Sequence, residues 1–192
     1  MTSTTSVWWP RRFCRTRPGT DAVTVRPRLD TDLERCLEVA RAVYDVDGYP
    51  PRGPIDVSVF LAPAQQLAAW VAEIDGDVVG HAALHDTGAA VTTAQAARYI
   101  GCDTGELALV ARVFVHPSVR RTGAARQLLE TAASDARRRG RRPILDVAVQ
   151  LTGATKLYES AGWEHAGTVT IEIPGAPDLS CHVYVGPALN EQ

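Results

Sequence analysis

The stretch VHPSVRRTGAARQLLETAA, residues 115–133, joins the end of an apolar strand to the start of an amphipathic helix. Between them lie Arg120 and Arg121, followed by a run of small residues at 122–125. A helix N-terminus leaves about four main-chain N–H groups without intrahelical partners and carries roughly half a positive charge. Small side chains keep these donors open to an oxygen-rich ligand. The junction therefore fits an anion such as a pair of phosphates, although a closely packed helix start would need the same small residues.

The size and charge of the chain limit its class. Its 192 residues suffice for one α/β domain with a core and are too few for two. The formal net charge of −2 gives no general attraction to nucleic acid or to anionic lipid. The four cysteines lack C-x-x-C spacing, and the five histidines lack metal-ligand spacing. We therefore expect a cytoplasmic protein with free thiols, no bound metal, and no nucleic-acid or membrane partner.

Hydrophobic periodicity divides the chain into strands and helices. Residues 1–20, rich in Ser, Thr and Arg, are predicted to form a disordered tail ahead of one domain at 21–192. Strands are predicted at 22–28, 68–74, 77–85, 106–117, 143–150, 163–173 and 179–186, and helices at 30–44, 123–139 and 152–162. Shorter helical segments are expected at 55–63 and 87–100. This order predicts an α/β fold with a single mixed sheet of about seven strands flanked by about four helices.

The common phosphate-binding motifs do not explain the junction at 115–133. The chain contains no G-x-x-x-x-G-K-[ST], and no G-x-G-x-x-G follows its first strand. H-E-x-x-H and G-x-S-x-G are also missing. A Walker-type nucleotidase is thereby excluded in practice and a dinucleotide-binding fold is disfavoured, so the junction needs another explanation.

Two other segments resemble a known family. VFVHPSVRRTGAARQLLETAASDA (113–136) resembles the acyl-CoA signature of the GNAT superfamily of N-acyltransferases, R/Q-x-x-G-x-G/A at a helix start, with Arg120, Gly123 and Ala125 at its defining positions. Further along, ATKLYESAGW (154–163) resembles the second signature, A-x-x-L-Y-x-x-x-G-F/W. The resemblance covers roughly residues 22–187. Leu151 departs from it, because the family often has Asn there, seven residues before the Tyr.

The resemblance implies the fold detail and the co-substrate. The sheet should be mostly antiparallel and splayed between its fourth and fifth strands. Coenzyme A would lay its diphosphate on the main-chain N–H groups of the 121–126 segment and its pantetheine arm along the exposed edge of the long strand. The cofactor-binding residues implied in this way are Val113, Phe114, Val115, Arg120, Arg121, Thr122, Gly123, Ala124, Ala125 and Arg126. The segment 87–105 is longer than the usual connection, and a lid, a substrate wall or a dimer contact is left open for it.

Transfer of an acyl group to an amine poses two proton problems. Exposing the lone pair of a lysine-like ammonium at pH 7 costs about 4.6 kcal/mol, and the departing thiolate must be stabilised. The resemblance assigns the second task to Tyr158 as general acid, with a packing role in the core as the alternative. Glu106, at the start of the long strand, is our first choice for the base. Glu73, His81 and His85 compete with it, and a solvated surface carboxylate is the alternative for Glu106 itself.

The acceptor is less well defined by the sequence. Asp45, Asp47 and Asp56 lie where the family commonly builds its acceptor pocket, which hints at a cationic amine, although ordinary surface charge explains them equally well. The cluster RRRGRR at 137–142 lies at a helix C-terminus, where cations complement the dipole, and so argues only weakly for nucleic acid. We expect an acetyl-CoA-dependent N-acetyltransferase for a small-molecule or peptide amine, with a non-catalytic acyl-CoA sensor as the alternative and a homodimer left open.

Overall fold

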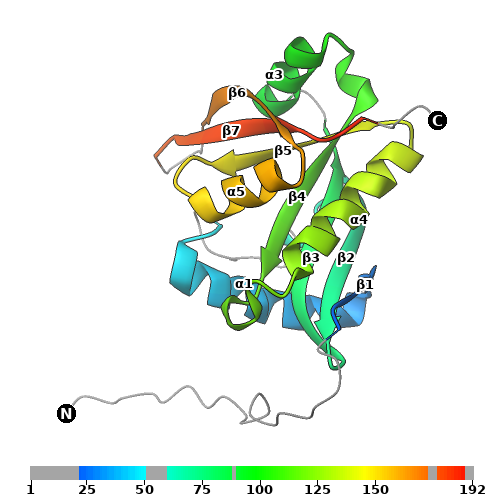
Figure 1. Ribbon diagram of the computed structural model, residues 1–192, viewed down its shortest axis with the longest axis vertical. Coiled ribbons are helices and arrows are strands. Elements are labelled where there is room, and N and C mark those ends of the chain that lie inside the picture. The colour runs from blue at the N-terminus through cyan, green and yellow to red at the C-terminus, as the bar shows by residue number, and fades with distance from the viewer. Residues whose placement is uncertain (1–21, 51–59, 88–89, 173–176, 189–192) are drawn as a thin grey trace.

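The computed structural model describes residues 22–50, 60–87, 90–172 and 177–188, which form a seven-stranded sheet with helices on both faces (Figure 1). The strands are β1 (Thr24–Pro27), β2 (Gln66–Ile74), β3 (Asp77–Asp86), β4 (Leu107–Val115), β5 (Arg142–Ala148), β6 (Glu164–Ile171) and β7 (Leu179–Val185). The helices are α1 (Leu33–Asp47), α3 (Val91–Ile100), α4 (Ala124–Arg138) and α5 (Thr152–Ser160). This arrangement confirms the predicted α/β fold, including the inserted helix, here α3. The predicted tail at 1–20 and Asp56 lie outside the described residues.

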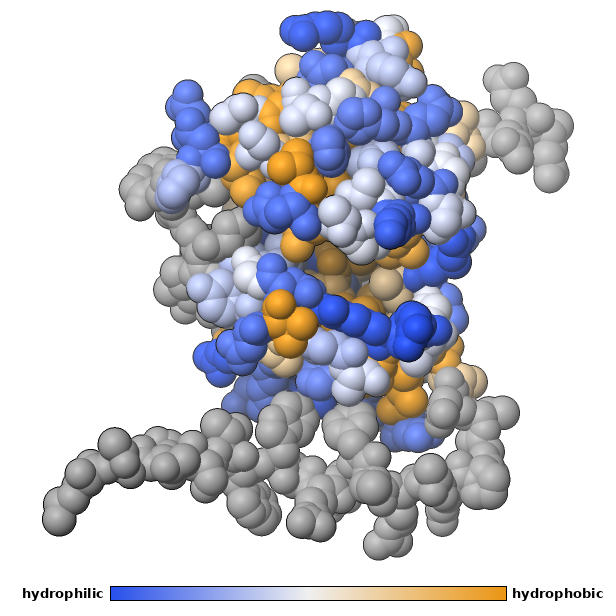
Figure 2. Space-filling view, turned by 60° about the vertical axis from the view of Figure 1, so that its left-hand side comes forward, coloured by the Kyte–Doolittle hydropathy of each residue, from blue (hydrophilic) through white to orange (hydrophobic). Residues whose placement is uncertain are grey.

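The order of strands is β1-β2-β3-β4-β5-β7-β6, and all neighbours are antiparallel except β4 and β5. The parallel β4–β5 ladder extends only from the pair Leu107–Arg142 to the pair Leu109–Ile144. Beyond these pairs the two strands diverge, as the resemblance implied. We term the opening between residues 110–115 and 145–148 the split. Figure 2 shows a recess across the middle of one face, with apolar residues on its floor, between the half of the molecule that carries α5 and the half that carries α1.

A β-bulge shapes β4 at the split. On β3, His81 pairs with Phe114 and Ala83 with Ala111, so two residues of β4 lie opposite one residue of β3. Arg112 has a φ of 56°, a left-handed conformation that is costly for a residue with a side chain. The Nδ1 atom of the buried His81 lies 3.1 Å from the Arg112 carbonyl oxygen and holds the bulge in place.

The core is divided between the two faces of the sheet. α4 contributes Leu128, Leu129 and Ala132 to the larger cluster on one face. On the other face, α1 packs Cys36 and Val39 against one end of the sheet, and α3 packs against the other end. The predicted hairpin turn is confirmed, since Asp75 and Gly76 both have positive φ. The strand predicted at 106–117 is shorter, because Glu106 belongs to a 3-10 turn (Thr104–Glu106) ahead of β4.

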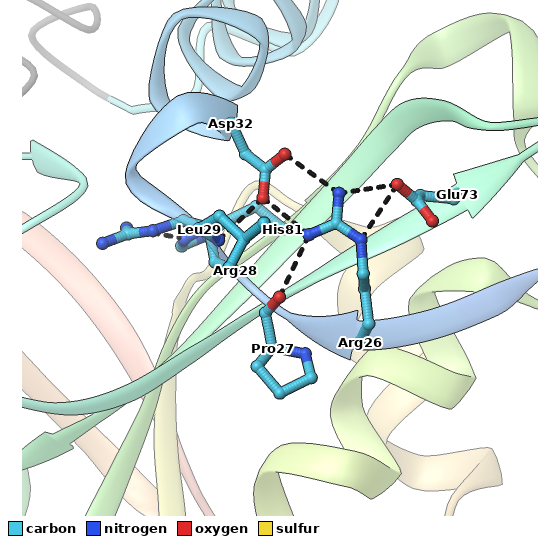
Figure 3. A network of polar contacts seen from close by, with 7 residues as sticks. All are labelled: Arg26, Pro27, Arg28, Leu29, Asp32, Glu73 and His81. Carbon is cyan, nitrogen blue, oxygen red and sulfur yellow. Dashed lines mark hydrogen bonds and ion pairs between the residues drawn. The ribbon is translucent and has the colours of Figure 1, made fainter.

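A polar network fixes α1 to the sheet (Figure 3). The Arg26 guanidinium on β1 donates to Asp32, at 2.7 Å, and to Glu73 on β2, at 2.6 Å. Asp32 also accepts the Leu29 N–H at 2.7 Å. The hydrogen bond from Arg26 holds the pKa of Asp32 below its usual value, so this carboxylate stays ionised. The edge strand, the start of α1 and the hairpin are thus joined by one guanidinium.

Gly80 on β3 permits the close approach of β3, β4 and α4. A Cβ atom there would lie 2.8 Å from Val115 Cγ1, 3.0 Å from the Phe114 carbonyl oxygen and 3.1 Å from Leu128 Cδ1. We expect Gly80→Ala to lower the free energy of unfolding by about 1–3 kcal/mol in urea denaturation, since main chain as well as side chains must shift. The matched control is Gly105→Ala, where a Cβ meets nothing within 4 Å. Equal stability of both variants would contradict this account of Gly80.

Candidate active site

The loop between β4 and α4 forms an open set of main-chain donors. Arg121 and Gly123 have φ values of 67° and 90°, and no side chain caps the helix. Within the described part of the chain, the N–H groups of Arg121, Thr122, Gly123, Ala125 and Arg126 have no hydrogen-bond partner, and that of Ala124 makes only a 3.4 Å contact to Thr122 Oγ1. A Cβ on Gly123 would meet nothing within 4 Å, and residues 121–123 are exposed, so no neighbouring side chain covers this part of the loop. This donor set fits a diphosphate.

Arginine side chains tie this loop to both halves of the molecule. Arg120 forms an ion pair with Asp47 at the end of α1. Arg126 donates to the Ser160 hydroxyl at 2.7 Å and to the Ser160 carbonyl at 3.2 Å, at the end of α5. The side chain of Arg121 is exposed. Asp47, predicted to lie near an acceptor pocket, is therefore engaged by Arg120.

The predicted strand contacts lie along one edge of the split. β4 has no strand partner on its β5 side beyond Leu109 among the described residues, so Val113, Phe114 and Val115 occupy a free edge. Phe114 is buried and stacks on His81, with ring centroids 5.3 Å apart. Val113 and Val115 pack against the α4 side of the sheet. Main chain on this edge is open to pairing with an extended ligand.

Tyr158 lies in α5 with its ring in the core. Only 6% of its surface is exposed, and its ring centroid lies 5.9 Å from that of Tyr184 and 6.2 Å from that of Trp163. Its hydroxyl has no hydrogen-bond partner among the residues that the structure describes. Burial raises its pKa, so the hydroxyl stays protonated and can only donate to an anion.

Glu106 and Tyr158 are not in direct contact. Tyr158 packs on Tyr184, whose strand partner is Leu145. By the β4–β5 register, residue 106 lies about 13 Å along the sheet from the level of Leu145. The Glu106 carboxylate is exposed and accepts the Asp103 N–H at 3.0 Å.

The other base candidates are either ion-paired or weak bases. Glu73 is held by Arg26. Burial lowers the pKa of His81 to about 3 and that of His85 to about 4, so both rings are neutral at pH 7. The described residues contain no group of three His, Cys, Asp or Glu that could hold a metal ion.

Two charged residues in the split were missed by the sequence analysis. Asp146 on β5 accepts a 2.6 Å hydrogen bond from Thr92 Oγ1 on α3. Burial raises the pKa of Asp146, against the opposing effects of the Thr92 hydroxyl and the Arg112 charge. Arg112 lies across the split with its guanidinium 4.5 Å above the Phe60 ring. An acidic residue inside the apolar strand PILDVAVQ (143–150) was the available signal for Asp146, because an unpaired carboxylate in a strand core is costly.

Comparison with known proteins defines the family. A sequence profile of the acetyltransferase (GNAT) family matches residues 33–163. The chain therefore belongs to the GNAT acetyltransferase family, as its two signatures suggested. Among curated proteins, no relative matches the sequence. No helix among the described residues is long and apolar enough to cross a membrane.

Known structures share the fold at low sequence identity. An N-acetyltransferase from Staphylococcus aureus Mu50 superimposes with a TM-score of 0.64 at 20% identity, over 85% of this chain and 97% of its own. The putative acetyltransferase yncA from Salmonella typhimurium, solved with its cofactor acetyl-CoA, gives 0.65 at 20% identity, over 89% and 96%. A ribosomal-protein-alanine N-acetyltransferase from Brucella melitensis gives 0.61 at 20% identity, over 84% and 98%. At 20% identity, these TM-scores show a common fold and nothing more.

The buried neutral histidines make stability depend on pH. Both pKa values lie below the ordinary 6.5, so the unfolded chain binds more protons than the folded one once the pH falls below 6.5. The unfolding free energy should therefore decrease from pH 6.5 downward, by up to about 1.4 kcal/mol per pH unit for each histidine, until pH reaches the folded values. Urea denaturation at several pH values measures this slope. His85→Gln should flatten it and His165→Gln, at an exposed position, should not.

Proposed function

We propose that this protein is a cytoplasmic N-acetyltransferase that moves the acetyl group of acetyl-CoA to the primary amine of a small molecule or peptide. The observation that carries the proposal is the set of unpartnered N–H groups at the start of α4, next to the free edge of β4. Membership of the family supports it, as does the presence of acetyl-CoA in the Salmonella relative. The free thiols of Cys36, Cys102 and Cys181 suit a reducing compartment.

The residues that would hold the co-substrate are those of the loop and the strand edge. The N–H groups from Arg121 to Arg126 would receive the diphosphate, and the main chain of 113–115 would pair with the pantetheine arm. One charge at a helix terminus contributes only about 0.3–1 kcal/mol, so several donors and the exposed Arg121 must act together. When bound, the co-substrate supplies an activated thioester.

Tyr158 is the proposed proton donor to the leaving sulfur. In the overall reaction the ammonium loses two protons on becoming an amide, one of which balances the thiolate. A thiol has a pKa of about 8.5, so complete transfer from the less acidic Tyr158 hydroxyl is unfavourable. Tyr158 therefore acts as general acid only if its proton is replaced: its hydroxyl donates to the developing thiolate, one proton released by the amine restores the hydroxyl, and the second amine proton leaves to solvent.

Glu106 stays our prediction for the base, acting through water. The Glu106 carboxylate accepts the Asp103 N–H of its own 3-10 turn, and none of its contacts among the described residues reaches the split. The packing of the Tyr158 ring on Tyr184 and Trp163 also suits the second candidate function, a non-catalytic acyl-CoA sensor. Release of free thiol in the presence of amines distinguishes the enzyme from the sensor.

Binding of acetyl-CoA tests the loop. Isothermal calorimetry should detect heat with the unaltered protein, and Gly123→Val should raise Kd at least about tenfold, because a β-branched residue is strained at φ 90° and its side chain would crowd the donors. Gly105→Ala, away from this loop, should bind like the unaltered protein. If the unaltered protein gives no heat, the proposed function is wrong.

Kinetics test the two proton-transfer residues. We expect Tyr158→Phe to lower kcat by about 10–100-fold with little change in the KM for acetyl-CoA, since general acid catalysis contributes on the order of 100–10,000-fold and the phenyl ring keeps the packing. An unchanged kcat and pH profile would exclude Tyr158 from the chemistry. Glu106→Gln is the companion variant. If Glu106 is the base, the fall of kcat/KM at acidic pH in the unaltered protein should disappear in this variant.

A further inference from the structure

Arg112 and Asp146 face each other across the split, on the side of the sheet away from α4. Asp146 has the same orientation as Ile144, which packs with α3, and it is bonded to Thr92 of that helix. The bulge turns Arg112 to the same side, where its guanidinium lies over Phe60. The two residues stand just past the last β4–β5 pair, at the point where the strands begin to separate.

Neither charge is fully satisfied by the protein. Among the described residues, Asp146 has one hydrogen-bond partner, Thr92, and no ion pair joins it to Arg112. The Nε atom of Arg112 is buried without a partner. Both side chains remain partly exposed, so a ligand in the split can reach them. Charges in a partly dry opening are costly unless something completes their pairing.

The remaining groups around the pair carry no charge of their own at pH 7. Tyr49 accepts a hydrogen bond from the Arg112 guanidinium, and Tyr158 lies within electrostatic range of Asp146. His85 is close enough to Arg112 for the guanidinium to lower its pKa further, and burial keeps it neutral. Burial also raises the pKa of the nearby Cys181 thiol, to about 12. The split therefore offers a ligand the guanidinium of Arg112 and the carboxyl group of Asp146, and the next cation, Arg28, lies behind His81.

We propose that Arg112 and Asp146 form the acceptor subsite and that the acceptor is a small zwitterion, a free α-amino acid whose carboxylate pairs with Arg112 and whose ammonium pairs with Asp146. This inference rests on the proposed function and narrows its substrate class. A simple amine would leave the Arg112 guanidinium, whose neighbour Tyr49 is neutral, without a counter-ion and would bring a second cation beside it. The N-terminus of a peptide carries an amide where the free amino acid carries its carboxylate, so a peptide is disfavoured for the same reason.

Matched acceptors test the subsite. Thiol release from acetyl-CoA is measured with free α-amino acids, with the corresponding amino-acid amides, and with the amines left by decarboxylation. The amino acids should exceed both analogues by at least about 100-fold in kcat/KM, because a site built to bind a charged group rejects analogues that lack it. Equal or better rates with the amides or amines would overturn the zwitterion subsite and leave the acetyltransferase intact.

Variants assign the two charges. Arg112→Gln should raise KM for amino acids and reduce the preference over amides to within about tenfold, whereas Asp146→Asn should lower kcat/KM for all three panels. Arg112→Lys keeps the charge and should retain part of the preference. The controls are Arg98→Gln and Glu130→Gln, both exposed and outside the split. Thermal unfolding verifies that each variant is folded, and an unchanged preference in folded Arg112→Gln overturns the proposal.

Failure of this inference is separable from failure of the proposed function. Calorimetric heat with acetyl-CoA but no transfer to any free amino acid excludes the zwitterion subsite alone. If acetyl-CoA gives no heat, the acetyltransferase assignment itself is excluded, and the subsite with it.

Discussion

The hydrogen-bond ladder between β4 and β5 ends at the pair Leu109–Ile144, and the chemistry proposed for this protein depends on that interruption. Parallel strands normally continue pairing because unpaired main-chain groups are costly in a core. Here the bulge at Arg112, held by His81, turns β4 away from β5. The cost of the free edge is acceptable where an extended ligand can pair with it, and the same divergence creates the recess seen in Figure 2.

The loop between β4 and α4 is held from both sides of this opening. Arg120 reaches α1 and Arg126 reaches α5, while the intervening N–H groups stay free. Gly80 lets α4 pack directly on β3 and β4 through Leu128. A donor set fixed in this way needs little reorganisation to receive phosphate oxygens, and preorganisation of this kind raises affinity without additional contacts.

Electrostatics separate the two faces of the split. Tyr158 presents a protonated hydroxyl from the α5 side, suited to a leaving thiolate. Arg112 and Asp146 present opposite charges on the other side, suited to an acceptor that carries both. The buried histidines stay neutral and take no part in charge pairing at pH 7. Amine and thioester would thus approach each other through the same gap from opposite faces of the sheet.

The sequence by itself determined the alternation of strands and helices, the Asp75–Gly76 turn and the loop of small residues ahead of α4, because periodicity, turn chemistry and a small-residue helix start are local properties of the chain. It identified the two family signatures for the same reason. It placed Glu106 at the start of a strand, where the structure has a 3-10 turn, and it did not find Arg112 or Asp146. Only the tertiary structure decided which charges meet, since strand register, the bulge and the end of the β4–β5 ladder arise from pairing between segments far apart in sequence.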